Sequence, residues 1–353
     1  DEGEFGFGLL ASPLALGLDL PANAVLLDAV ISAAIPDPDV PVVPLPLEDV
    51  VGIFERSTGN PIWRHFELFS PGGPSYEGRA EVELVVRMIS QVGNYDYIVD
   101  WVFTQAGSIR VEVSLTGIDV PKGVESRHLD DHSARSDTAF GTLVAPNLVA
   151  TYHSHHFNFR LDMDVDGPKN NFVLGRLKSV KAGRKSPRKS IWTVENRLLR
   201  RERMAALDDE ESVWRVESAH DKNALGYSTS YVLESGGNGE PLLDPEDFRR
   251  AGFIEHDLWV TAFDADERFA AGDTPNQNPG RPGLPRYIAN NENIAHADIV
   301  LWHTVTFHHV TAAEDFPVLP RESASFELVP ANFFDRNPAI DLRRAPFEVL
   351  PEP

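Results

Sequence analysis

The stretch "AEVELVVRMISQVGNYDYIVDWVF", residues 80–103, decides the fold class of this chain. Its two halves are rich in valine and aromatic residues and alternate apolar with polar positions, a pattern typical of half-buried β-strands. Between them lies "NYDY", in which Asn94 and Asp96, both poor strand formers, flank Tyr95. This interruption predicts a kinked or bulged strand that carries a half-buried tyrosine.

The same strand pattern recurs along the chain in "SIRVEVSLTGIDV", "YVLES", "LWVTAF" and "IVLWHTVTFHHV". Turn clusters such as "SPGGPS" and "TPNQNPGRPGLP" separate these segments, and the 27 prolines and 25 glycines fit many short connections. Only "DPEDFRRAG", residues 244–252, and "TVENRLLRRERMAAL", residues 193–207, favour a helix. The sequence therefore predicts one all-β domain over residues 1–353, a large antiparallel β-sandwich.

Composition narrows the functional classes. The chain has 353 residues, 42% of them hydrophobic, which is enough for a sizeable core. Its formal net charge of -22 disfavours nucleic acid and anionic membranes as partners and attracts cations, protonated amines included. No apolar run approaches the ~20 residues of a membrane helix, and the first residues lack the features of a secretory signal. The absence of cysteine excludes disulfides, thiolate metal sites and cysteine nucleophiles.

Basic residues concentrate in one segment. Between Arg176 and Arg203, eleven residues are basic and only Glu195 and Glu202 are acidic. Either a long exposed β-ribbon or a contact with an acidic partner subunit explains this distribution.

Histidines give the first chemical signal, in "TYHSHHFNFRLDMDVDG", residues 151–167. On a strand, His153 and His155 leave the same face, whereas His156 points the other way. Such a pair can chelate copper, zinc, iron or nickel, or be a partly exposed histidine pair without a ligand. Asp162 and Asp164 alternate further along and suit a calcium-like ion or simply face solvent.

A third imidazole can come from "WHTVTFHHVTAAEDFP", which offers His303, His308 and His309. Three nitrogen ligands without a thiolate leave an open coordination position, as catalytic metal sites do.

At this point the chain resembles the copper amine oxidases, the topaquinone enzymes, over essentially its whole length. The matching stretches keep the family's order: "DEGEFGFGLLASPLALGLDLP", "NYDY", "HSH" with "FRLDMDVDG", "NNENIAHADIVLWHT", "WHTVTFHHVTAAEDFP" and "PANFFDRNPAIDL". The resemblance implies a single catalytic β-sandwich, and it implies that the small α/β domains preceding it in relatives are absent from this chain.

The resemblance also assigns roles to residues. It implies Cu(II) ligation by His153, His155 and His309, conversion of Tyr95 to topaquinone by copper and O2, and orientation of that ring by Asn94. It places the catalytic base at Asp1, which burial would make more basic. A second, calcium- or manganese-like ion would be held by Asp162, the Met163 carbonyl, Asp164, Asp298 and the Ile299 carbonyl.

The implied activity is oxidation of primary amines by O2 to aldehydes, with release of ammonia and hydrogen peroxide. The implied assembly is a homodimer embraced by β-arms, with no nucleic acid or membrane partner. The sequence does not decide the cellular compartment. Relatives are periplasmic or secreted, whereas a chain without cysteine suits a reducing compartment. Two alternatives are a non-enzymatic relative with unmodified Tyr95, acting as a metal-binding or structural subunit, and a zinc hydrolase on a β-sandwich.

Overall fold

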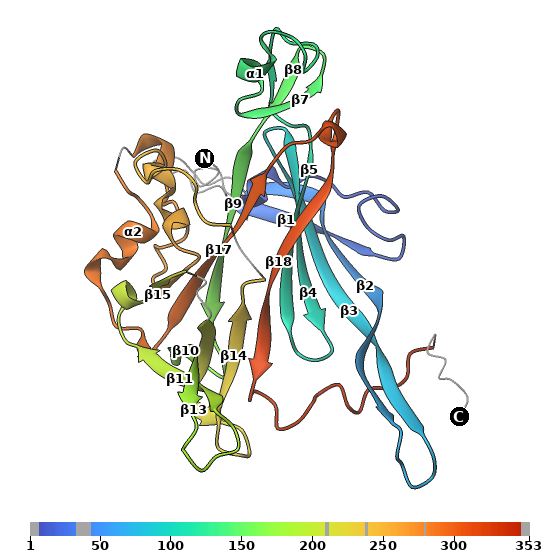
Figure 1. The fold of residues 1–353 in the computed structure, drawn as a ribbon, viewed down its shortest axis with the longest axis vertical. Helices are drawn as coiled ribbons and strands as arrows, with labels where there is room; N and C mark the ends of the chain where they lie inside the picture. The colour runs from blue at the N-terminus through green and yellow to red at the C-terminus, as the bar shows by residue number, and fades with distance from the viewer. Residues whose placement is uncertain (1–6, 33–43, 209–211, 237–238, 279, 347–353) are drawn as a thin grey trace.

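The computed structural model describes residues 7–32, 44–208, 212–236, 239–278 and 280–346 (Figure 1). Its strands form three sheets, and every strand pairing within the described residues is antiparallel. The prediction of an all-β, antiparallel sandwich is therefore confirmed.

The large sheet has 11 strands. In spatial order they are β1 (Val25–Ser32), β2 (Pro44–Glu67), β3 (Ser75–Val92), β4 (Tyr95–Thr104), β5 (Ile109–Gly117), β18 (Leu319–Ala331), β14 (Ser228–Glu234), β13 (Ser212–Lys222), β10 (Asn170–Lys181) and β11 (Ser190–Leu199), with β16 (Ala295–Ala297) paired to β10.

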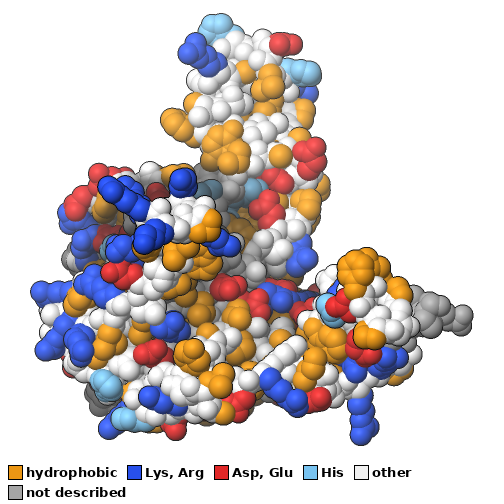
Figure 2. Space-filling model, turned by 60° about the horizontal axis from the view of Figure 1, so that its bottom comes forward, with side chains coloured by type: hydrophobic (Ala, Val, Ile, Leu, Met, Phe, Trp, Pro, Cys, Tyr) orange, Lys and Arg blue, Asp and Glu red, His pale blue; other side chains and the backbone are white. Residues whose placement is uncertain are grey.

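The second sheet, called the histidine sheet below, runs β12 (Ala206–Leu207), β15 (Leu258–Ala262), β17 (Ile299–His309), β9 (His153–Met163). A third sheet of β6 (Pro121–Gly123), β8 (Leu148–Thr151) and β7 (Gly141–Ala145) forms a lobe with helix α1 (Ala134–Asp137). This lobe stands clear of the body and exposes hydrophobic side chains such as Phe140 (Figure 2).

Helices are short. They are α2 (Leu284–Tyr287) and the 3-10 turns η2 (Phe7–Leu10), η3 (Glu202–Met204), η4 (Arg249–Glu255), η5 (Pro275–Gln277), η6 (Ile288–Asn290) and η7 (Ala313–Asp315). In the described part of the chain, none has the length and apolar character needed to cross a membrane.

The hydrophobic core lies between the large sheet and the histidine sheet. Val99 and Val111 of the large sheet and Leu161 and Leu301 of the histidine sheet belong to one buried cluster. Burying a side chain of this size contributes about 1.5–3 kcal/mol, so these contacts hold the two sheets together. The strands that carry tyrosine and histidine therefore face each other across the core.

The segment around Tyr95 is a hairpin turn and not the kinked strand that the sequence predicted. Val92 of β3 pairs directly with Tyr95 of β4, and Gly93 and Asn94 form the two-residue loop. Gly93 has a φ of 62° at the first loop position, where a tight hairpin favours glycine. The turn starts β4 so that Tyr95 and Tyr97 both face the core.

A second expectation was also wrong. Residues 193–207, which allowed a helix, instead form most of β11 followed by η3 and β12. β11 pairs with β10 over ten residue pairs, from Phe172–Leu199 to Lys181–Ser190. The backbone N–H and C=O groups of the segment form hydrogen bonds between the two strands of this hairpin. This strand pairing outweighs the weak helical propensity of the sequence.

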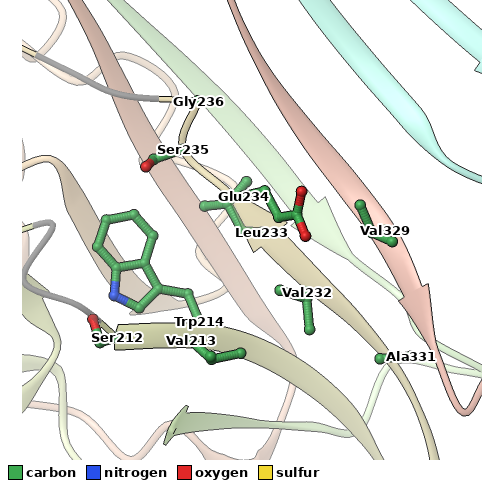
Figure 3. Close-up of a pocket in the computed structure, with 10 residues that line it drawn as sticks. All are labelled: Ser212, Val213, Trp214, Val232, Leu233, Glu234, Ser235, Gly236, Val329 and Ala331. Carbon is green, nitrogen blue, oxygen red and sulfur yellow. The ribbon is translucent and has the colours of Figure 1, made fainter. Parts of the chain in front are cut away.

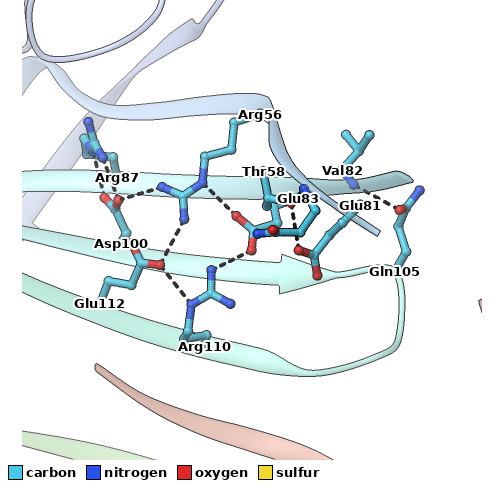
Figure 4. A network of polar contacts seen from close by, with 11 residues as sticks. Arg56, Thr58, Glu81, Val82, Glu83, Arg87, Asp100, Gln105, Arg110 and Glu112 are labelled. Atoms are coloured by element: carbon cyan, nitrogen blue, oxygen red, sulfur yellow. Dashed lines mark hydrogen bonds and ion pairs between the residues drawn. The ribbon is translucent and has the colours of Figure 1, made fainter. Parts of the chain in front are cut away.

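A network of paired charges links strands β2 to β5 of the large sheet (Figure 4). The Glu83 carboxylate is 1% exposed and accepts hydrogen bonds from Arg56 at 2.7 Å and from Arg110 at 2.5 Å. Arg87 donates two hydrogen bonds to Asp100, at 2.7 and 2.6 Å. Glu112 pairs with both Arg56 and Arg110, so three carboxylates balance the three arginines.

We expect Glu83→Ala to lower the free energy of unfolding by about 3–5 kcal/mol, because it leaves two arginines without their buried partner. Urea denaturation measures the change. Glu195→Ala, at an exposed pair with Lys178, should leave the midpoint nearly unchanged. Equal effects of the two substitutions would contradict this account.

Candidate metal centre

Three imidazoles meet at one end of the histidine sheet. β9 and β17 are paired so that His309 lies directly opposite His153, and Phe307 lies opposite His155. Because side chains alternate along each strand, His153, His155 and His309 leave the same face. Ligand atoms of the three lie within 4.8 Å of one another, close enough to share one ion.

One nitrogen of each imidazole contacts a group outside the three-histidine cluster. The His153 Nδ1 donates to the Thr151 carbonyl at 2.7 Å, and the His309 Nε2 donates to the Asp315 carboxylate at 3.1 Å. The His155 Nδ1 is 2.9 Å from the Tyr97 hydroxyl. Within the described residues, the buried His155 Nε2 and His309 Nδ1 have no hydrogen-bond partner. This donor set fits a copper ion, since imidazole suits that metal and its orientation is fixed by outer partners.

The Tyr95 side chain points at the three imidazoles from the large sheet. Its ring is 4% exposed and lies with its centroid 4.7 Å from that of His155. Its hydroxyl lies 2.8 Å from the His153 Nε2 and donates a short hydrogen bond to Asp119. The two sheets therefore bring a phenol into contact with the three imidazoles.

Burial sets the protonation of this cluster. Burial, and then electrostatic repulsion from the neighbouring imidazoles of His153 and His309, lowers the pKa of His155 to about 3. Burial, and then the hydrogen bond and charge of Asp119, raises the pKa of Tyr95 well above its usual range. Near neutral pH the chain thus presents a neutral imidazole, as metal ligation requires, beside a neutral phenol.

The other histidines of these strands lie elsewhere. The His303 Nδ1 is 3.0 Å from the Asp257 carbonyl, and its ring packs against Phe326 in the core. On the opposite face of the sheet, His156 contacts the Thr306 hydroxyl, and His308 contacts the Ser154 hydroxyl. Among the three alternatives on β17, only His309 joins the described cluster.

Two further residues were assigned roles by resemblance. Asn94 is exposed at the hairpin turn, where its carbonyl accepts a hydrogen bond from the Ile118 N–H at 2.9 Å. Asp1 lies outside the described residues.

The residues expected to hold a second ion lie at the other end of the same two strands, where Ile299 pairs with Met163. Asp298 carries a buried oxygen with no partner among the described residues, and burial, then Asp162 and Asp164, raises its pKa. The three carboxylates are not among the described groups whose ligand atoms meet within 4.8 Å.

Two cavities differ in their relation to the site. One of about 680 Å³ is lined by Tyr97 and His155 and by the aromatic rings of Trp101, Phe157 and Phe159. Another, of about 490 Å³, lies among β13, β14 and β18 beside Trp214, and none of its lining residues belongs to the imidazole cluster (Figure 3).

Sequence reasoning missed three members of this site. Tyr97, Asp119 and Asp315 each contact an imidazole or the Tyr95 hydroxyl. Tyr97 and Asp315 lie within the stretches that carried the resemblance, and Asp119 is a single carboxylate after a strand, without any spacing pattern.

Fold and site together define a β-sandwich metalloprotein in which a buried tyrosine faces three imidazoles. The sequence profile of the family described as "Copper amine oxidase, enzyme domain" matches residues 1–348. The chain therefore belongs to the copper amine oxidase family.

Individual relatives agree with this assignment. The chain is 38% identical to "Amine oxidase [copper-containing] gamma 1" of Arabidopsis thaliana over 98% of its own length and 48% of that relative. It is 39% identical to "Primary amine oxidase" of Klebsiella aerogenes, over 96% of this chain and 45% of that one. The crystal structure of a copper-containing benzylamine oxidase from Hansenula polymorpha superposes with a TM-score of 0.83 at 27% identity, covering 96% of this chain and 52% of that chain. The chain thus spans about half the length of the curated relatives that it matches.

Neighbouring histidines give a direct test of the ligand set. We expect His155→Ala to weaken Cu(II) binding by more than about 100-fold, because loss of outer partners alone costs 10–100-fold. His156→Ala, one residue further on the opposite face, should leave the affinity unchanged. Competition titration of the metal-free protein against a copper chelator measures both, and a similar loss in the two variants would contradict the assignment.

Proposed function

We propose that this chain is the catalytic unit of a copper- and topaquinone-dependent primary-amine oxidase, which converts primary amines and O2 to aldehydes, ammonia and hydrogen peroxide. The observation that carries the proposal is the contact between the Tyr95 hydroxyl and the His153 Nε2, at 2.8 Å, beside two buried imidazole nitrogens without partners. A phenol placed there is next to the position of a bound copper ion.

The quinone, once formed from Tyr95, would supply an electrophilic carbonyl and an electron sink, which ordinary side chains lack. The chain's own residues hold the reacting groups. Tyr97 packs against the Tyr95 ring with its centroid 6.0 Å away and also holds His155. Burial by the two sheets limits water at the ring. By resemblance, Asp1 would take the proton from the substrate carbon.

The cavity beside Tyr97 and His155 suits the hydrocarbon part of an amine. Its aromatic walls favour apolar groups, and its volume of about 680 Å³ lies within the range of small-molecule sites. The net charge of -22 attracts the protonated amine from solution.

A second ion is part of the proposal. The buried, unpartnered Asp298 oxygen, with Asp162, Asp164 and the carbonyls of Met163 and Ile299 nearby in the paired strands, supports a calcium- or manganese-like cation. Such an ion would tie β9 to β17 at the end opposite to the imidazoles.

Copper loading tests the proposed activity. Protein prepared without copper should gain a broad visible absorbance when Cu(II) is added in air, and phenylhydrazine should bleach it. The peptide containing Tyr95 should change in mass, and primary amines should then yield hydrogen peroxide. Tyr95→Phe should bind copper and remain colourless. A wild-type protein that binds copper but keeps an unmodified Tyr95 would support the non-enzymatic alternative instead.

We further propose that the protein is a homodimer. The β10–β11 hairpin carries the basic segment and exposes Leu177 and Trp192, at 55% and 72%, and the β2–β3 hairpin exposes Phe69 at 86%. Apolar side chains on projecting hairpins are typical of surfaces that a partner covers.

Light scattering should give about twice the 39.1 kDa mass of one chain. The double variant Trp192→Ser, Phe69→Ser should shift the mass toward one chain, while Leu225→Ser, at another exposed position, should not. A wild-type protein of single-chain mass at working concentration would refute the homodimer.

A further inference from the structure

Asp119 lies beside two of the three imidazoles, His153 and His309, although no sequence pattern marks it. Asp119 is 7% exposed, and its Oδ1 accepts the short hydrogen bond from the Tyr95 hydroxyl. The same oxygen lies 3.5 Å from the His309 Nδ1 and 4.0 Å from the His153 Nε2. The Asp119 carboxylate therefore contacts the Tyr95 hydroxyl and also lies close to two of the nitrogens that would bind the ion.

The backbone fixes Asp119 relative to Tyr95. Gly117, at the end of β5, pairs with Tyr95 and has a φ of 118°, and a Cβ there would lie 2.5 Å from the Asn94 carbonyl. The next N–H, that of Ile118, donates to the same carbonyl at 2.9 Å. The chain after β5 thus crosses tightly over the hairpin turn before Tyr95, which is why the phenol and the carboxylate meet.

Within the described residues, no arginine or lysine forms an ion pair with Asp119. Its ion-pair partners within the described residues are His153 and His309, and its Oδ2 is buried there without a hydrogen-bond partner. A buried carboxylate is costly unless a nearby cation compensates it. A cation bound by the three imidazoles would supply the compensating positive charge. The position of Asp119 therefore suits a role in the protein that has bound the ion.

We propose that Asp119 is a positioning residue for the conversion of Tyr95, holding the phenol hydroxyl beside the His153 imidazole while the ring is oxidised. This inference rests on the proposed function. In the conversion, the ring loses two hydrogen atoms and gains two oxygen atoms; two molecules of O2 are consumed and one hydrogen peroxide leaves. Asp119 orients the ring for these steps and is itself unchanged by them.

The test follows conversion and copper binding separately. Metal-free wild type, Asp119→Ala, Asp119→Asn and Asp119→Glu are mixed with Cu(II) in air, and the copper content, the visible absorbance and the mass of the Tyr95 peptide are followed over time. Thr116→Val serves as a control, because it removes a nearby hydrogen bond to the Leu319 carbonyl without touching the cluster.

We expect Asp119→Ala and Asp119→Asn to bind copper but to convert Tyr95 about 10–100-fold more slowly than wild type, the range seen when outer partners of a metal site are removed. Asp119→Glu, which keeps the carboxylate, should recover part of the rate, and Thr116→Val should match wild type. This pattern separates a positioning role from a general loss of folding.

Conversion of Asp119→Ala and Asp119→Asn at the wild-type rate would overturn the inference and leave the proposed function standing. Loss of copper by both variants would also overturn it, because Asp119 would then be a ligand. If wild type binds copper and Tyr95 stays unmodified, the inference and the proposed function both fail.

Discussion

The pairing of β9 with β17 is the constraint on which the metal centre depends. Direct pairing of His153 with His309 makes the two imidazoles cross-strand neighbours, and the two-residue period of the strand adds His155 on the same face. A shift of one residue would turn either strand's ligands to the opposite face, where His156 and His308 now lie. The core residues Leu161 and Leu301, directly paired in the same ladder, resist such a shift because it would expose them.

The large sheet completes the site from across the core. Its β3–β4 turn directs Tyr95 inward, and the end of β5 crosses that turn and brings Asp119 to the phenol. The ligand nitrogens come from β9 and β17, the phenol from the start of β4, and the carboxylate from the segment after β5. Backbone pairing fixes the position of each. Buried polar groups need partners, and two imidazole nitrogens that have none among the described residues are placed to bind an ion.

The fold class followed from the sequence because the runs of valine, isoleucine and aromatic residues in β3, β4 and β17 are long. The histidine pair followed from spacing, and the choice of His309 from resemblance. Predictions from local sequence patterns were wrong where strand pairing decides the structure. The kink expected at Asn94 is a hairpin turn, and the helix expected over residues 193–207 is mostly strand. Asp119 was beyond reach because it is a single carboxylate in a connection, placed only by contacts between distant strands.

The most direct measurement of the central claim is a crystal structure of the copper-loaded protein with anomalous diffraction recorded at the copper edge. The account predicts one peak about 2 Å from the His153 Nε2, the His155 Nε2 and the His309 Nδ1, with the Tyr95 ring beside it. A copper peak bound elsewhere, or one that omits any of these three imidazoles, would contradict it.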